Sequence, residues 1–166
     1  MTVRPVRPDD VPDLVRLVRE LAAYERAEHE VRLTEEQLTA ALFGDSPALF
    51  GHVATADDGA VVGLALWFLN FSTWRGTHGV YLEDLYVSPE HRGTGLGREL
   101  LRTLAAVCVE RGYSRLEWSV LDWNTPSIDF YRAAGAEPMD GWTVFRLTDD
   151  ALVAFSGGDG GGGARP

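Results

Sequence analysis

One stretch in the middle of the chain most constrains its fold: residues 81–100 have the pattern of a strand, a glycine-rich loop and a helix in succession. Aromatic, aliphatic and acidic residues alternate up to Ser88, and glycines then stand at positions 93, 95 and 97. Leucines recur at helical spacing from Leu96 onward. A strand that leads through such a loop into a helix commonly binds phosphate, because the first N–H groups of a helix have no intrahelical acceptor. The stretch therefore predicts a ligand that carries phosphate.

Residue spacing excludes two common phosphate loops. A P-loop carries lysine and then serine or threonine after its last glycine, whereas Gly97 is followed by Arg98 and Glu99. A dinucleotide fingerprint has the form Gly-x-Gly-x-x-Gly, and if Gly93 and Gly95 are its first two glycines, Arg98 occupies the third position. The loop thus predicts neither a nucleoside triphosphate nor a dinucleotide.

Composition narrows the class of protein. The chain has 166 residues, 45% of them hydrophobic, and a formal net charge of -10. This length favours one domain, and the acidic balance argues against a nucleic-acid partner while it suits a cationic substrate. The single cysteine, Cys108, excludes an internal disulfide, and the four histidines show no metal-ligand spacing. With no apolar run of membrane-spanning length and no signal-peptide pattern, we expect a cytoplasmic protein that contacts no membrane and binds no metal.

Periodicity and turn residues predict an α/β fold, in the sense of an α+β mixed sheet with helices on both faces. Hairpin-linked strands come first and helical crossovers follow, so most strand pairs should be antiparallel. We expect one domain over residues 1–152 and a disordered glycine-rich tail over residues 153–166. The predicted strands are residues 2–7, 48–56, 60–71, 80–88, 115–121 and 142–147, and the predicted helices are residues 10–25, 34–43, 96–111 and 127–134.

Two motifs carry a resemblance to a known family. The pattern Arg92-x-x-Gly95-x-Gly97 resembles the acetyl-coenzyme A loop of GNAT-type N-acetyltransferases. The pattern Asn124-x-Pro126-Ser127-x-x-Phe130-Tyr131 is similar to the second signature of the same superfamily, in the expected order along the chain. The resemblance implies the GNAT fold, a central and mostly antiparallel sheet that splays at the acetyl-CoA site.

Further segments resemble the diamine acetyltransferase family, also called the spermidine/spermine acetyltransferase group. The segments Ser72-Thr73-Trp74 and Val120-Leu121-Asp122-Trp123-Asn124 look closest to its branch that acetylates thialysine. The polyamine branch carries an aspartate two residues before the tryptophan, where this chain has Ser72. The resemblance covers about residues 3–147 and implies a homodimer with its amine sites near the interface.

The same resemblance assigns the acetyl-CoA residues. The glycine loop and the first helical turn should hold the pyrophosphate, the strand before the loop should expose main-chain groups to the pantetheine arm, and a polar anchor should follow. These cofactor residues are Leu85, Tyr86, Val87, Arg92, Gly93, Thr94, Gly95, Leu96, Gly97, Arg98, Asn124 and Tyr131. Asn124 could equally be a plain N-cap of the helix that follows.

The implied reaction is acetyl transfer from a thioester to an amine. An alkyl ammonium has a pKa of about 10.4, so it must lose a proton before it attacks. By resemblance Tyr131 is the general acid for the leaving thiolate, although it could also be an aromatic core residue. Glu83 is the candidate base, acting through water, although it could also be a solvent-facing carboxylate. Glu83 and Asp84 should point to opposite faces if their strand is regular.

A cationic amine is best bound by carboxylates and by aromatic faces for its methylene stem. The predicted substrate residues are Tyr24, Glu25, Glu28, Trp74 and Asp84. Three functions remain open: acetylation of thialysine or a lysine-like amino acid, acetylation of a polyamine or diamine, and acyl-CoA binding without catalysis. An amino-acid substrate would also need a partner for its own carboxylate, for which Arg75 or His78 is available in the adjacent loop.

Overall fold

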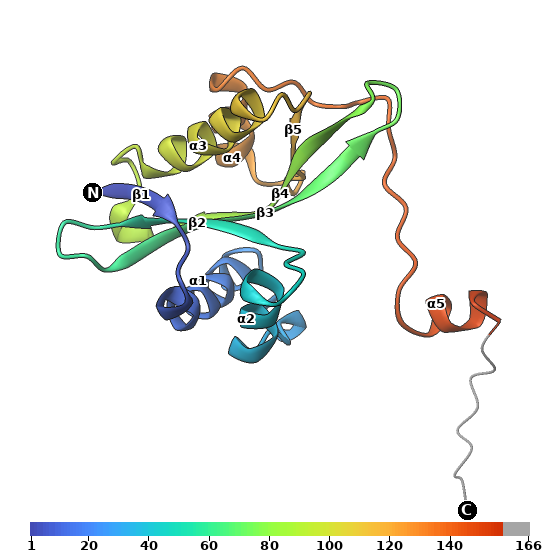
Figure 1. The fold of residues 1–166 in the computed structure, drawn as a ribbon, viewed down its shortest axis with the longest axis horizontal. Helices are drawn as coiled ribbons and strands as arrows, with labels where there is room; N and C mark the ends of the chain where they lie inside the picture. Colours follow the sequence, from blue (N-terminus) through green and yellow to red (C-terminus); the bar gives the residue numbers. More distant parts are fainter. Residues whose placement is uncertain (158–166) are drawn as a thin grey trace, which may run out of the picture. The chain divides into compact units, whose positions relative to one another are not determined.

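The computed structural model describes residues 1–157 and comprises two compact units, residues 1–125 and residues 126 onward. The sheet and most of the helices belong to the first unit (Figure 1). Its elements are β1 (Thr2–Pro5), η1 (Pro8–Asp10), α1 (Val11–Tyr24), η2 (Glu28–Glu30), α2 (Glu35–Phe43), β2 (Phe50–Thr55), β3 (Val61–Ser72), β4 (Thr77–Val87), η3 (Pro89–His91), α3 (Leu96–Glu110) and β5 (Leu116–Glu117).

The five strands form one mixed sheet in the order β1-β2-β3-β4-β5. The first three pairings are antiparallel and the last, between β4 and β5, is parallel. Helices α1 and α2 cover one face of the sheet and α3 covers the other (Figure 1). The predicted α/β class and mostly antiparallel sheet are therefore confirmed.

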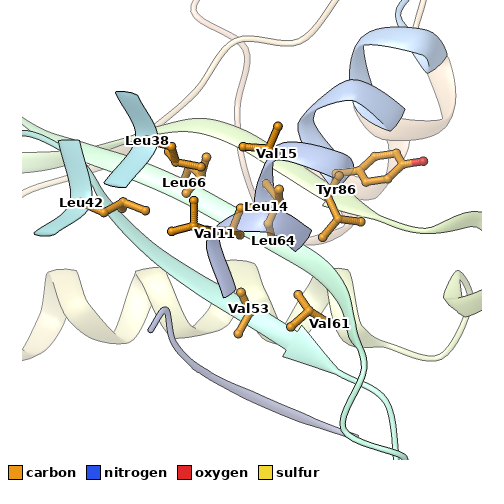
Figure 2. Close-up of a cluster of buried hydrophobic side chains, with 11 residues drawn as sticks. Val11, Leu14, Val15, Leu38, Leu42, Val53, Val61, Leu64, Leu66 and Tyr86 are labelled. Carbon is orange, nitrogen blue, oxygen red and sulfur yellow. The ribbon is translucent and has the colours of Figure 1, made fainter. Parts of the chain in front are cut away.

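Burial explains why the central strand is almost wholly apolar. Seven consecutive residues of β3, from Val61 to Trp67, are buried, because helices lie over both faces of the sheet. On the α1 side, Leu14 of α1 lies in one core with Leu64 and Leu66 of β3 (Figure 2). Leu17 of α1 belongs to the same cluster. The side chains of Leu14 and Leu17 are fully buried, which contributes about 1.5–3 kcal/mol each.

Local signals fix the starts of the helices on this face. Threonine at position 34 followed three residues later by glutamine is the pattern of a capping box, and the structure contains it: the Thr34 side chain accepts from the Gln37 N–H at 3.2 Å, and the Gln37 side chain accepts from the Thr34 N–H at 3.0 Å. Before α1, Arg4 of β1 forms two hydrogen bonds with the buried Asp10 carboxylate, at 2.6 and 2.8 Å. This pair lowers the pKa of Asp10 and ties the first strand to the helix entry.

The second unit contains α4 (Thr125–Ala133), which begins at the unit boundary, and α5 (Asp149–Phe155). The predicted strand at residues 142–147 is wrong: these residues form neither helix nor strand. A strand needs a neighbour for its backbone groups, and residues 126–157 contain no strand to supply one. Helix α5 extends into the first three residues of the predicted tail, and residues 158–166 lie outside the described part of the chain.

Candidate active site

The sheet opens where the site was predicted. Parallel pairing between β4 and β5 stops after Val80↔Leu116 and Tyr81↔Glu117, whereas β4 continues to Val87. From Leu82 onward, this edge of β4 has no strand beside it within residues 1–157. Backbone N–H and C=O groups on an open edge can pair with an extended ligand much as they pair with a strand. The predicted cofactor residues of β4 lie on this open stretch.

The opposite edge of β4 carries a β-bulge at Glu83. Leu66 pairs with Asp84 and Trp67 pairs with Leu82, so Glu83 has no residue opposite it on β3. A bulge breaks the alternation of side chains along a strand, so the regular-strand expectation for Glu83 and Asp84 does not apply. Asp84 is partly buried and shares the face of its partner Leu66, which packs under α1.

Three carboxylates interact at this bulge. Burial, together with the smaller effect of the negative charges of Glu83 and Glu25, raises the pKa of Asp84 to about 6. Burial also raises the pKa of Glu25, the residue that follows the last turn of α1. Three of the predicted site residues are thus brought together from two elements. Such a concentration of negative charge suits an ammonium group.

The glycine loop has the geometry expected of an anion site. Gly95, the N-cap of α3, adopts a left-handed conformation with φ of 90°, and Gly93 has φ of 75°. The first intrahelical bond runs from the Glu99 N–H to the Gly95 carbonyl, at 3.0 Å. The N–H groups of Leu96–Arg98 therefore precede the hydrogen-bonded ladder and point out of the helix start.

The loop lies against the end of β4. A Cβ atom added to Gly97 would lie 3.9 Å from a methyl group of Val87. The Arg92 Nε donates to the Val87 carbonyl at 3.0 Å, and its guanidinium carbon lies 5.0 Å from the Tyr24 ring centroid and 5.3 Å from that of Tyr86. Arg92 is therefore held between two aromatic rings, where its charge still adds to the potential of the loop.

Tyr24 and Asn124 meet although they are 100 residues apart. The Tyr24 hydroxyl donates to the Asn124 side-chain oxygen at 3.0 Å, and the Tyr24 ring centroid lies 6.0 Å from that of Trp123. Asn124 is buried. Tyr24, predicted to contact substrate, thus also joins the end of α1 to a predicted cofactor residue.

Two predicted substrate residues do not join the carboxylates. Trp74 lies in the turn between β3 and β4 and is 90% exposed. The strand alone from Thr77 to Asp84 spans about 23 Å at 3.3 Å per residue. Glu28, in η2, is exposed and lines a separate hollow with Arg19 of α1, and it is not among the charges that raise the pKa of Asp84.

Tyr131 belongs to the second unit. It lies on α4, where its ring centroid is 5.3 Å from that of Phe130. Its assignment as general acid therefore still rests on the sequence motif that it shares with the superfamily.

The sequence reasoning gave no role to Arg26 or to the Trp123 side chain. The Arg26 guanidinium carbon lies 5.3 Å from the Trp123 ring centroid. Arg26 has φ of 63°, a left-handed conformation that costs a residue with a β-carbon about 1–2 kcal/mol. This turn could not be predicted from the sequence, because a helix that ends in a left-handed residue usually has glycine at that position and here the residue is arginine.

The structure can now be compared with known proteins. Residues 13–136 match the model of the acetyltransferase (GNAT) family, which is about three quarters of the chain. The chain belongs to the GNAT acetyltransferase family. It is an acetyl-transferring enzyme that acts on amines, as its membership of this family and its similarity to curated acetyltransferases show.

Curated relatives cover nearly the whole domain. The thialysine N-epsilon-acetyltransferase of Bos taurus is 37% identical, over 93% of this chain and 96% of its own. The L-ornithine N5-acetyltransferase of Arabidopsis thaliana is 30% identical, over 92% of this chain and 86% of its own. The spermidine/spermine N(1)-acetyltransferase-like protein 1 of Homo sapiens is 31% identical, over 91% of this chain and 23% of its own.

Solved structures agree on the fold. An integron cassette protein of V. cholerae superposes with a TM-score of 0.78 at 24% identity, over 93% of this chain and 96% of that one. An aminoglycoside acetyltransferase from an uncultured soil metagenomic sample gives a TM-score of 0.75 at 19% identity, over 90% of this chain and 96% of that one.

Within residues 1–157, no group of three or more side chains is placed to bind a metal ion. No helix in that range is both long enough and apolar enough to cross a membrane.

Proposed function

We propose that this protein transfers the acetyl group of acetyl-CoA to the primary amine of a small cationic substrate, namely thialysine or a lysine-like amino acid. The observation that carries the proposal is the group of three carboxylates, Glu25, Glu83 and Asp84, at the bulge of the strand whose other edge is open. Similarity over almost the full length to thialysine acetyltransferases supports this substrate class.

The residues at the opened sheet fit acetyl-CoA. The N–H groups at the start of α3 and the left-handed Gly95 suit a pyrophosphate, and the open edge of β4 at Leu85–Val87 suits the amide groups of the pantetheine arm. A main-chain N–H on this edge would stabilise negative charge on the thioester oxygen as the amine attacks. When bound, acetyl-CoA supplies the activated acyl group.

The chain's own residues handle the protons. We assign Glu83 as the group that accepts a proton from the substrate ammonium through a water molecule, since it is exposed at the bulge beside Asp84. The neutral amine then attacks the carbonyl carbon, a carbon–nitrogen bond forms and the carbon–sulfur bond breaks. Tyr131 gives its proton to the departing thiolate, and the proton that the new amide nitrogen loses passes through water to restore the Tyr131 hydroxyl.

A polyamine is the second candidate substrate. The three carboxylates would suit several ammonium groups, and a human relative is a spermidine/spermine acetyltransferase-like protein. Ser72, at the position where the polyamine branch carries aspartate, favours the amino acid instead.

We further infer that the protein acts as a homodimer in the cytoplasm. Trp74 is exposed at a hairpin tip, far along β4 from Asp84, so it could contact an amine only in the site of a second copy. Cys108 is a buried free thiol, which suits a reducing compartment.

A panel of amines tests the function. Purified protein should release CoA from acetyl-CoA with thialysine or lysine, and with a lower kcat/KM for spermidine and putrescine. Tyr131→Phe should lower kcat by about 10²–10⁴-fold without lowering the Tm, because only the proton donor is lost. Tyr113→Phe is the matched control, since Tyr113 contacts His78 at the far end of the sheet. Wild-type turnover in Tyr131→Phe would remove it from the mechanism, and no turnover with any amine would refute the proposed function.

A further inference from the structure

The last turn of α1 has an unusual residue at its end. The Ala27 N–H donates to the Ala22 carbonyl at 2.8 Å and the Arg26 N–H donates to the Ala23 carbonyl at 3.1 Å, which is the paired pattern of a Schellman motif. Arg26 occupies the left-handed position of that motif, with φ of 63°. Glycine is favoured there because it has no β-carbon. An arginine at this position works against the backbone preference, and an outlier of this kind is a reason to look for a function.

The Arg26 side chain is positioned by an aromatic ring, and its guanidinium N–H groups remain available to donate hydrogen bonds. Its guanidinium lies over the Trp123 ring, with 5.3 Å between the guanidinium carbon and the ring centroid. A cation–π contact uses the charge of the guanidinium and no hydrogen-bond acceptor, so the N–H donors remain available in the guanidinium plane. Within residues 1–157, no carboxylate forms an ion pair with Arg26. The residue is exposed, so an anion from solution can reach it.

Its surroundings place Arg26 at the rim of the amine site. It directly follows Glu25, whose charge acts on Asp84 at the bulge of β4. The Trp123 ring beneath it also contacts Tyr24, whose hydroxyl donates to Asn124. Contacts through Trp123 and Tyr24 therefore join Arg26 to a predicted cofactor residue, and Arg26 is the chain neighbour of one of the three carboxylates.

The charges within the site impose an orientation on an amino-acid substrate. Its side-chain end carries an uncompensated ammonium, which the three carboxylates attract, whereas at its α-end the carboxylate, which they repel, offsets the α-ammonium. The side-chain ammonium is therefore favoured within the cluster, and the α-carboxylate then lies outside it, separated from the reacting amine by the length of the side chain. A cation at the rim is the group that can receive it.

We propose that Arg26 binds the α-carboxylate of the substrate. The enzyme would then prefer α-amino acids with a side-chain amine, such as lysine, to the diamines that lack only the carboxylate. The proposal rests on the proposed acetyl transfer to amines and names the feature of the substrate that the site selects. Trp123 holds the guanidinium in place, and the bond to the substrate is a charge-assisted, two-pronged contact.

Three other cations are less suitable. Arg75 and His78 lie at the β3–β4 hairpin, where the His78 Nδ1 is 3.1 Å from the Asn70 carbonyl oxygen and Arg75 is part of the turn. Arg92 already donates to the Val87 carbonyl between two tyrosine rings, beside the phosphate loop. Loss of Arg92 would therefore affect every amine through acetyl-CoA, whereas loss of Arg26 should affect only substrates that carry a carboxylate.

Matched substrate pairs isolate this contact. Lysine and cadaverine differ only by the α-carboxylate, as do thialysine and bis(2-aminoethyl) sulfide. In Arg26→Gly, kcat/KM should fall about 10–100-fold for the two amino acids and stay within about twofold for the two diamines, because one charge-assisted contact is lost. Arg26→Gly suits the left-handed turn, so the variant should fold at least as well as the wild type. Arg32→Gln removes another exposed arginine and should change neither member of a pair.

The outcomes separate this inference from the proposed function. An equal loss on both members of each pair would mean that Arg26 only supports the Trp123 loop, and an unchanged preference would also overturn the proposal. If the wild type acetylates no amine, the proposed function fails first. Calorimetric affinities of the CoA-loaded protein for lysine and cadaverine then still test Arg26. The Arg26→Gly variant should bind lysine more weakly than the wild type does and should bind cadaverine equally well. Equal affinities of the wild type and Arg26→Gly for lysine would overturn the proposal.

Discussion

The Asp84 carboxyl group should make the protein less stable at neutral pH than at pH 4, and Asp84→Asn should remove this effect. Its pKa is raised from an ordinary value of 3.8 to about 6 by burial and by the charges of Glu83 and Glu25. All three causes disfavour the ionised form, and all are lost when the chain unfolds. The folded protein therefore binds more protons than the unfolded chain between about pH 4 and pH 6.

The size of the effect follows from the difference between the two pKa values. About 2 pH units at about 1.36 kcal/mol each correspond to at most about 3 kcal/mol. Since the folded state holds the extra proton, stability falls as pH rises from about 4 to about 6, and the loss is complete above pH 6. Asp84→Asn should thus be up to about 3 kcal/mol more stable than the wild type at pH 8, with the two nearly equal at pH 4.

Urea denaturation at several pH values between 4 and 8 measures this difference directly. Asp10→Asn serves as a control of opposite sign, because the Arg4 side chain lowers the pKa of Asp10, so that its loss should destabilise the protein at neutral pH. A difference between the wild type and Asp84→Asn that does not change with pH would refute the reasoning. So would an Asp84→Asn variant less stable than the wild type at pH 8.

Two further substitutions test the catalytic groups. Glu83→Gln should lower kcat by about 10²-fold at pH 7 and less at pH 10, where about a third of an amine with a pKa of about 10.4 is already neutral. An equal loss at both pH values in a steady-state pH profile would exclude a proton-acceptor role. Gly95→Ala and Gly59→Ala both place a β-carbon at a left-handed position with no atom within 4 Å. Urea titrations should therefore show that both variants lose about 1–2 kcal/mol of unfolding free energy. Only Gly95→Ala should raise the KM for acetyl-CoA. Equal KM values in these two variants would contradict the role of the Gly95 turn.

Local chemistry explains what the sequence could predict. The capping box at Thr34 and the glycine turn at Gly95 depend on residues within one turn of each other, and both occur as expected. The order of strands and helices follows from side-chain periodicity, which is also local. The sequence motifs also indicate the family, because proteins that use the same co-substrate tend to share residue patterns.

Features that depend on distant partners could not be predicted in this way. The bulge at Glu83 exists only in the pairing of β4 with β3, and the shortness of β5 depends on how far β4 and β5 diverge. The segment over residues 142–147 has a strand-like pattern but forms no strand, because pattern alone supplies no neighbour. The left-handed conformation of Arg26 could not be predicted for a different reason. It is set by the Schellman hydrogen bonds at the end of α1, and arginine is not a residue type that indicates such a conformation.

The bulge and the left-handed turn together support the ammonium site proposed above. A regular β4 would place Glu83 and Asp84 on opposite faces, whereas the bulge lets both charges act together with Glu25 at the end of α1. The resulting repulsion lowers stability in the empty protein, and a bound ammonium relieves it because it favours the ionised form of Asp84. In the proposed complex, part of the binding energy for the amine would therefore come from relief of the repulsion among these carboxylates. The same three charges would repel a substrate carboxylate, so the proposed selection of an amino acid needs a cation outside the cluster, which is the role proposed for Arg26 beside Trp123.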